Sequence, residues 1–580
     1  EMLRSLVGSE MCIRDSGNGG AIYNAGDILG HYTPAITGNF IGNHADGAGG
    51  AIYNIGGDDD YQSYYGYIDT ISGNFIANTS NSVGGAIANI TSVYVSISDS
   101  PVIEEIHANF ISNSAKRSGG AIYNGGYGSN IGEIKGDFVG NYVEGSNTQG
   151  GAIYNTTGWN EYVGNVDGQI GTISGTFTGN YAKSSSGDAL GGAIYNEGHI
   201  DSYYNISLIN NYAESTDGKA QGGAIYSKEN VNITADNYNS LFDGNYVKDA
   251  SGIDSNVIYM APHVDVESTY KGPTYRTTTA TNLNLNAENN GTITINDKIN
   301  GIGAIRTTTE DDVVIEQDTS VTNYGVNFTG DETGVIYLNN NIEAEDYENT
   351  ETGEVTEGRA DVSLSDVTLH LGVRDDVLNN NNFTVNSGTW NMVNNQTGVA
   401  ALNSFTVAGD TNFVADVDLL NESMDRITAN EYGEHSGNLV VSGMNLLSDA
   451  PEDRDVTEIY FAQPGLKDNV LNGVSNGTGD LPDSNQTTFY TPIYKYNAVY
   501  DNRADAGYFV FTKGDKIYTP GGEIPGGGTT GGGTTGGGTI DTGNPSDAFN
   551  PAVLTVPVAN QAASQAAMTE AFKYVFEHAD

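Results

Sequence analysis

Apolar residues alternate with polar ones in short runs along the chain, and glycine and asparagine punctuate these runs. Residues 21–24, Ala-Ile-Tyr-Asn, show the pattern, in which alternate side chains lie on one face of a strand. Residues 68–71 and 170–173 supply further short strands. Helix signals are absent through residues 17–250, and no apolar run reaches the roughly 18 residues of a membrane-spanning helix. The pattern therefore predicts an all-β chain.

Two motifs repeat within this pattern. Paired glycines followed by Ala-Ile-Tyr-Asn, or a close variant, occupy residues 19–24, 49–54, 84–89, 119–124, 150–155, 191–196 and 222–227. A Phe-x-x-Asn motif starts at Phe40, Phe75, Phe110, Phe138, Phe177 and Phe242, with Leu208 in place of phenylalanine in one copy. An interval of about 30 to 40 residues is typical of a solenoid whose coils carry loops of variable length on one side.

The chemistry of the motifs fits stacked coils. Paired glycines permit a tight bend, and an isoleucine that faces the core places the asparagine two residues later on the same side. We therefore expect a column of isoleucines, a ladder of asparagine amides and a column of phenylalanine rings. The residues assigned to building the solenoid are Gly19, Gly20, Ile22, Asn24, Phe40, Asn43, Gly49, Gly50, Ile52, Asn54, Phe75, Asn78, Phe110, Asn113, Gly119 and Gly120. Whether each repeat forms one coil or more stays open.

The Gly-Gly-Ala-Ile and Phe-x-x-Asn motifs of residues 17–250 resemble the repeats of chlamydial polymorphic membrane proteins and related autotransporter adhesins. The resemblance implies a parallel β-helical passenger that leaves the cell through its own outer-membrane barrel and takes part in attachment. The implied partner is a glycan or protein on a host or neighbouring cell. Right-handedness is expected from the resemblance and from the usual chirality of parallel crossovers.

Composition changes divide the chain further. Residues 251–520 lose the hexapeptide but keep short strands, and we interpret them as continued β-helix with an aromatic cap near residues 494–511. Residues 521–546 are a Gly/Thr-rich linker, and residues 547–580 resemble the helical start of an autotransporter translocator. Residues 1–16 match none of the pattern and look like translated adapter sequence, so we interpret them as non-native. The native start and the barrel are expected outside this sequence.

The charge of the chain excludes some partners. Lys and Arg number 23 against 73 Asp and Glu, which gives a formal net charge of −50. Such a field repels phosphate backbones and anionic headgroups, so nucleic acid is excluded as a partner. The single cysteine, Cys12, leaves no intramolecular disulfide framework.

Catalysis is disfavoured on the residues available. The acidic clusters 58–60, 311–312 and 375–376 sit in polar stretches and are expected to be solvated turns, and neighbours in a strand point to opposite faces. The histidines are scattered without zinc-ligand spacing, so we expect no catalytic, metal or cofactor site. A β-helical polysaccharide lyase or glycosidase, built from distant coils, stays open as an alternative.

Ligand contacts are expected on the loops between motifs. The candidates are the aromatic residues Tyr61, Tyr64, Tyr65, Tyr67, Trp159 and Tyr162. Exposed aromatic rings with polar neighbours suit recognition of glycans or proteins, although rings that only shield the coils fit equally well. A non-binding structural stalk is a further alternative, and it predicts loops of uniform length.

Overall fold

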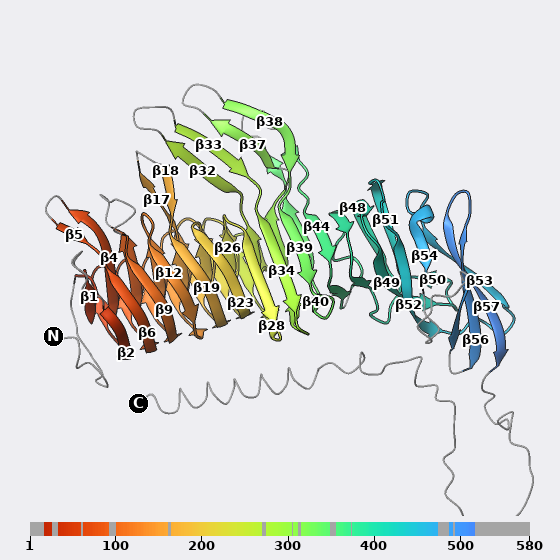
Figure 1. The fold of residues 1–580 in the computed structure, drawn as a ribbon, viewed down its shortest axis with the longest axis horizontal. Coiled ribbons are helices and arrows are strands. Elements are labelled where there is room, and N and C mark those ends of the chain that lie inside the picture. Colours follow the sequence, from red (N-terminus) through yellow and green to blue (C-terminus); the bar gives the residue numbers. More distant parts are fainter. Residues whose placement is uncertain are drawn as a thin grey trace, which may run out of the picture.

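The computed structural model describes residues 17–25, 33–59, 62–91, 100–160, 164–268, 274–303, 305–310, 315–348, 355–372, 374–473, 486–490 and 493–516. These residues form a parallel β-helix whose coils stack along one long axis (Figure 1). Apart from one 3-10 turn, η3 (Lys467–Asn469), the named elements are strands. The prediction of an all-β parallel solenoid is therefore confirmed. The described part of the chain contains no helix with the length and apolarity that a membrane crossing requires.

One sequence repeat makes one coil of three strands. In the second coil, β4 (Ile52–Asp59) is followed by β6 (Tyr67–Ile76) and β7 (Thr79–Ser80). Their equivalents in the next coil pair with them in parallel, with Ile52 opposite Ile87, Phe75 opposite Phe110 and Thr79 opposite Ser114. Both motifs therefore keep their register from coil to coil, which answers the question that the sequence left open.

Three sheets run along the solenoid. The isoleucine sheet contains β1 (Ile22–Asn24), β4, β8 (Ile87–Thr91), β11 (Ile122–Gly125), β16 (Ile153–Asn155), β22 (Ile194–Asn196), β26 (Ile225–Ser227), β31 (Ile258–Met260), β36 (Ile299–Ile302) and β41 (Ile342–Glu345). The short-strand sheet contains β3 (His44–Ala45), β7, β10 (Ser114–Ala115), β14 (Tyr142–Gly145), β20 (Tyr181–Ser184), β24 (Tyr212–Ser215), β29 (Tyr246–Asp249) and the antiparallel β30 (Gly252–Ser255).

The long-strand sheet continues through the second half of the molecule. Its strands are β2 (Thr33–Ile41), β6, β9 (Val102–Ile111), β12 (Asn130–Lys135), β13 (Phe138–Val139), β19 (Gln169–Thr178), β23 (His199–Ile209), β27 (Val231–Asp236), β28 (Asn239–Asp243), β34 (Asn282–Glu288), β35 (Thr292–Ile295), β39 (Gly325–Gly330), β40 (Val335–Leu338), β44 (Asp361–Ser365), β45 (Thr368–Leu371), β46 (Asn382–Val385), β47 (Thr389–Asn391), β48 (Val399–Val407), β49 (Thr411–Asp418), β50 (Ser423–Met424), β51 (Arg426–Tyr432), β52 (Leu439–Ser448) and β54 (Val470–Asn472).

The core contains the predicted columns. The phenylalanine rings at 40, 75, 110, 138 and 177 stack face to face, with successive centroids 4.7, 5.0, 4.7 and 4.6 Å apart. Ile52, Ile87 and Ile122 are fully buried in the same core, whereas Ile22 in the first coil is partly exposed. Burial of aromatic and aliphatic side chains in every coil is the main stabilising contribution.

Two asparagine ladders run inside the coils. The predicted ladder joins asparagines 24, 54, 89, 124, 155 and 196, with Nδ2 to Oδ1 distances of 2.6 to 3.0 Å. A second ladder joins the asparagines of the Phe-x-x-Asn motif at 43, 78, 113, 141, 180, 211 and 245. It ends on Asp297, whose carboxylate accepts bonds from the backbone N–H and Nδ2 of Asn245 at 2.9 and 2.8 Å. The buried amides therefore find partners in adjacent coils.

The paired glycines are required by close backbone approach. Gly119 has a φ of +64°, and a Cβ on Gly120 would lie 2.0 Å from the carbonyl oxygen of Gly151 in the next coil. Any side chain at the second glycine would separate the coils, which explains the invariant pair in the motif.

An antiparallel sheet covers the C-terminal end of the solenoid. It contains β53 (Val456–Ala462), β57 (Gly507–Lys516), β56 (Tyr494–Asn502) and β55 (Gln486–Tyr490), in that spatial order. The Tyr500 hydroxyl donates to the Lys467 carbonyl at 2.8 Å, and Asn472 Nδ2 donates to the Ala498 carbonyl at 3.3 Å. The aromatic strands near residues 494–511 thus lie against the last coils. Residues 1–16, the linker 521–546 and the predicted helix in 547–580 lie outside the described residues.

Candidate functional site

Antiparallel insertions project from one corner of the solenoid. Each insertion follows a strand of the isoleucine sheet: β5 (Gln62–Tyr64) follows β4, and β17 (Thr157–Asn160) with β18 (Gly164–Asp167) follows β16. Farther along, β32 (His263–Ser268), β33 (Thr274–Thr279), β37 (Ile305–Glu310) and β38 (Ile315–Thr322) form one sheet, and β42 (Tyr347–Glu348) pairs with β43 (Val355–Thr356). Figure 1 shows the insertions up to β38 rising on the same side. The predicted one-sided loops are thus present, and their lengths differ.

The described aromatic residues predicted as ligand contacts lie in the first two insertions, except Tyr67, which begins strand β6 of the coil. Tyr64 lies in β5 and Trp159 lies in β17. Tyr65 and Tyr67 are half-buried, and their rings stack with centroids 6.2 Å apart. Two other candidates, Tyr61 and Tyr162, lie outside the described residues. The four described candidates therefore lie at two separate places on the solenoid, and one pair of rings among them is stacked.

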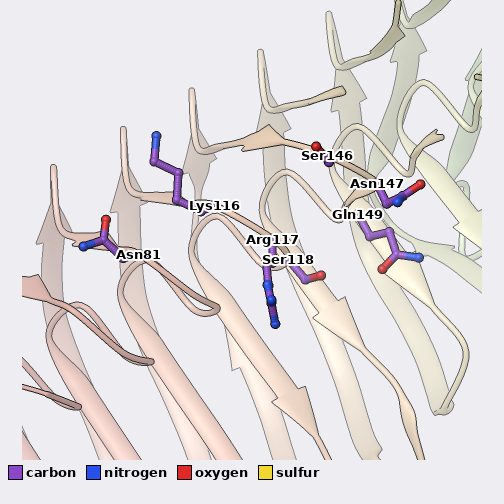
Figure 2. Close-up of a pocket in the computed structure, with 7 residues that line it drawn as sticks. All are labelled: Asn81, Lys116, Arg117, Ser118, Ser146, Asn147 and Gln149. Atoms are coloured by element: carbon purple, nitrogen blue, oxygen red, sulfur yellow. The ribbon is translucent and has the colours of Figure 1, made fainter. Parts of the chain in front are cut away.

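A groove of about 500 Å³ lies at a different corner, where the short-strand sheet turns toward the glycine pairs. Its lining residues come from three successive turns: Asn81, Lys116, Arg117, Ser118, Ser146, Asn147 and Gln149 (Figure 2). The turn lengthens at this place, from residues 116–118 in one coil to residues 146–149 in the next. The added residues begin a short strand stack of β15 (Thr148–Gln149), β21 (Ala189–Leu190) and β25 (Ala220–Gln221). The groove lies where the short turn of one coil is followed by the longer turn of the next coil.

Backbone hydrogen bonds between coils hold the floor of this groove. Arg117 N–H donates to the Ser82 carbonyl at 3.0 Å, and Gln149 N–H donates to the Arg117 carbonyl at 3.3 Å. Ser118 forms a parallel bridge with Gln149 in the following coil. Asn147 is fixed by its own N–H, which donates to the Ser186 carbonyl at 3.0 Å. Backbone hydrogen bonds from the neighbouring coils therefore hold the groove in place.

Several side chains in the groove have no partner inside the protein. Within the described coils, Lys116 and Arg117 form no ion pair, and the side chains of Ser118, Ser146 and Gln149 form no hydrogen bond. Lys116 and Arg117 are exposed. In contrast, Lys228 contacts Glu197 at 2.6 Å, as expected in a chain rich in carboxylates. The groove presents two cations and the unused side chains of Ser146 and Gln149 to the solvent, whereas Ser118 is buried.

A buried cluster of aspartates lies in the C-terminal coils. Asp416 and Asp425 are fully buried and Asp375 is 9% exposed. Asp416 accepts bonds from the backbone N–H groups of Asn394 and Gln396 at 2.8 and 3.1 Å. Asp425 accepts bonds from the N–H groups of Gly398 and Asp416 at 2.8 and 2.6 Å.

Burial, together with repulsion from Asp416, raises the pKa of Asp375 to about 6. Burial and the carboxylate of Asp375 raise the pKa of Asp425 to about 8. The expectation that acidic cluster 375–376 is a solvated turn is therefore wrong for Asp375, because the loop at residues 392–398 covers this carboxylate. It holds for Asp376, which is half-exposed beside Arg374.

The aspartate cluster does not offer a catalytic pair. A general acid or base has to reach the proton that it transfers, and Asp416 and Asp425 have no exposed surface. No set of three or more His, Cys, Asp or Glu side chains is placed to hold a metal ion anywhere in the described residues. Asp58 and Asp59 lie in the first hairpin, whereas Asp60, Asp311 and Asp312 lie outside the described residues. We interpret the buried cluster as a structural feature.

Sequence reasoning did not identify the groove. Two signals point to it in retrospect. One is the pair of adjacent basic residues at 116–117 in an acidic chain, and the other is that Asn141 and Gly150 are farther apart in the sequence than Asn113 and Gly119.

No family model matches the chain, and a search of the curated proteins finds no significant match.

Proposed function

We propose that this chain is the exported passenger of a bacterial autotransporter, held at the outer membrane and exposed outside the cell as an adhesin or interaction protein. The observation that carries the proposal is the placement of the insertions. Each follows an isoleucine strand, so all of them extend one corner of a regular solenoid. This geometry presents loops along a rod, and it suits binding of a partner on another surface.

The regular part of the coils has little capacity left for recognition. The two asparagine ladders use their own amides, and the phenylalanine and isoleucine side chains are buried. Recognition is therefore left to the turns and the insertions. A structural stalk predicts equal coils, whereas here β5 is a three-residue strand and the hairpins β32–β33 and β37–β38 of two successive coils pair into a four-stranded sheet. The unequal insertions favour binding over a stalk.

A polysaccharide lyase or glycosidase is less well supported. Glycoside hydrolysis uses two carboxyl groups that flank the bond being cleaved. Asp375 and Asp425, whose pKa values are raised, accept bonds from the loop at residues 392–398. Asp297, whose pKa burial also raises, accepts bonds from Asn245 inside the coils. The described groove is lined by amides, hydroxyls and cations instead. A binding surface therefore fits these residues better than a hydrolytic centre.

Export also fits the composition and the fold. The one cysteine of the chain leaves it free of intramolecular disulfides, so no such cross-link prevents passage in an unfolded state. Coils that contact mainly their neighbours can then form one after another once outside.

Surface display and adhesion test the proposal together. The 580-residue chain would be fused ahead of an outer-membrane autotransporter barrel in a non-adherent bacterium, with the barrel alone as control. We expect antibody labelling of intact cells and increased attachment to epithelial layers or matrix proteins. A variant whose β17–β18 hairpin, residues 157–167, is replaced by a short Gly/Ser turn separates the hairpin's contribution from that of the rod.

Each other outcome contradicts part of the proposal. Absence of the chain from the cell surface would overturn export. Display without attachment to any surface would favour the stalk, and release of unsaturated uronates from acidic polysaccharides would favour the lyase.

A further inference from the structure

We infer that the groove at residues 81, 116–118 and 146–149 binds an acidic sugar of a glycan, with Arg117 holding the sugar carboxylate. The inference rests on the proposed adhesive function and names its ligand class.

The first argument is the state of the cations. In this chain basic side chains are outnumbered, and the described ones commonly contact carboxylates, as Lys298 does with Asp254 at 3.0 Å and Glu343 at 3.2 Å. Lys116 and Arg117 are adjacent, exposed and without an ion pair among the described residues. Neither cation therefore has a carboxylate of the described chain as its counter-charge. A carboxylate from outside would supply the missing partner.

The second argument is the neutral part of the lining. Figure 2 shows Arg117 beside Ser118 on one turn and Gln149 on the next, while Lys116 extends in another direction. The side chains of Ser146, which is exposed, and Gln149, which is half-buried, make no hydrogen bond within the described coils, so their hydroxyl and amide are available to sugar hydroxyls. A volume of about 500 Å³ lies in the range of small-molecule sites.

The third argument excludes ligands with dense negative charge. The chain carries a net charge of −50, and only two cations line the groove. In a polyphosphate or a strongly acidic peptide, one anionic group could pair with a cation of the groove. The anionic groups next to it would lie against the acidic surface around the groove and be repelled. One carboxylate surrounded by hydroxyls meets the lining better, because a guanidinium binds a carboxylate through two parallel hydrogen bonds.

The experiment measures ligand binding by the purified full chain at physiological salt. Calorimetry or ligand-observed NMR would compare a sialic acid trisaccharide, a glucuronic acid disaccharide, the neutral disaccharide lactose and a glutamate-rich peptide. We expect one or both acidic sugars to bind, with lactose and the peptide at least about tenfold weaker. The two acidic sugars distinguish sialic acid from uronic acid as the source of the carboxylate.

Variants locate the binding in the groove. We expect Arg117→Gln to weaken acidic-sugar binding about tenfold and Lys116→Gln to weaken it less, because Lys116 contributes attraction without the paired hydrogen bonds. The matched control is the double variant Lys135→Gln and Lys495→Gln, which removes two other lysines that form no ion pair within the described residues. Unfolding midpoints of all variants, including the control at the half-buried Lys495, would show that the substitutions leave the fold intact.

Several results would overturn the inference. Equal binding of lactose, equal loss in the control variant, or a preference for the acidic peptide would each do so. If displayed cells adhere but the purified chain binds no acidic sugar, the inference falls and the adhesive function stands. If the chain binds acidic sugars through Arg117 but displayed cells do not adhere, the groove stands and the adhesive function falls.

Discussion

Replacing Asp375 by asparagine should stabilise the C-terminal coils at pH 8. Asp375 is 9% exposed as a residue and lies near the buried Asp416, and Asn394 Nδ2 donates to its carboxylate Oδ1 at 2.9 Å. Asparagine keeps an oxygen to accept that bond and removes a negative charge from the cluster. The charge costs stability because the pKa of Asp375 is raised from 3.8 to about 6, chiefly by burial.

The size and the pH range of the effect follow from this rise in pKa. A rise of about two pH units at 1.36 kcal/mol each gives about 3 kcal/mol as an order of magnitude. The folded-state pKa of Asp375 lies above its unfolded value. The contribution of Asp375 to the free energy of unfolding is therefore fully present below pH 3.8, and it is lost as the pH rises through about 6. Asp375→Asn should therefore be more stable by about 2–3 kcal/mol at pH 8 and nearly equal to wild type at pH 4.

Trp390 provides the assay. Its ring is fully buried in the same coils and meets Phe413 edge-on, with centroids 5.5 Å apart. In a Trp159→Phe background Trp390 is the only tryptophan, so its fluorescence during urea unfolding reports this region. Asp376→Asn is the matched control, because Asp376 is half-exposed beside Arg374 and such pairs contribute at most about 1 kcal/mol.

Two results would refute the reasoning. One is a loss of stability in Asp375→Asn at pH 8, which would mean that the ionised carboxylate is favourable in the folded state. The other is a gain that is the same at pH 4 and pH 8, which would have no electrostatic origin.

Three further predictions concern the coils. Phe138→Ala should lower the free energy of unfolding by about 3–5 kcal/mol. Phe138→Leu should lower it less, because Leu208 occupies the same column. Urea titrations followed by circular dichroism would measure both. Asn141→Ala removes the acceptor for the Asn113 N–H and the donor to the Phe110 carbonyl, and should cost about 3 kcal/mol in the same titration. Gly120→Ala should abolish folding or expression, because its Cβ would lie 2.0 Å from the Gly151 carbonyl oxygen. Gly42 has a φ of +64° but open space around it, so Gly42→Ala should lower the free energy of unfolding by only about 1 kcal/mol, as measured by thermal melts.

Much of the fold could be predicted because the repeat places the same chemistry at the same point of every coil. The alternation in Ala-Ile-Tyr-Asn indicated which side of the strand faces inward, and this predicted the ladder that includes Asn54 and Asn89. The second ladder follows the same logic. It was not predicted, because the turn after Phe-x-x-Asn shows no alternation that would indicate which way Asn113 points.

The sites were harder to predict because they depend on differences between coils. The groove exists where one turn is longer than the turn before it, and that step becomes a cavity only when the coils are stacked in register. Asp375, Asp416 and Asp425 are separated in sequence, and a loop that carries Asn394 covers them. No local pattern marks such a loop, so Asp375 resembled a solvated acidic turn in the sequence.

Binding of the purified full chain to an array of host glycans and matrix proteins, with a turnover assay on acidic polysaccharides alongside, tests the central claim most directly. We predict saturable binding to at least one immobilised ligand and no cleavage of any polysaccharide. Cleavage, or the absence of binding to every ligand on the array, would contradict the assignment of this β-helix as a surface-binding protein.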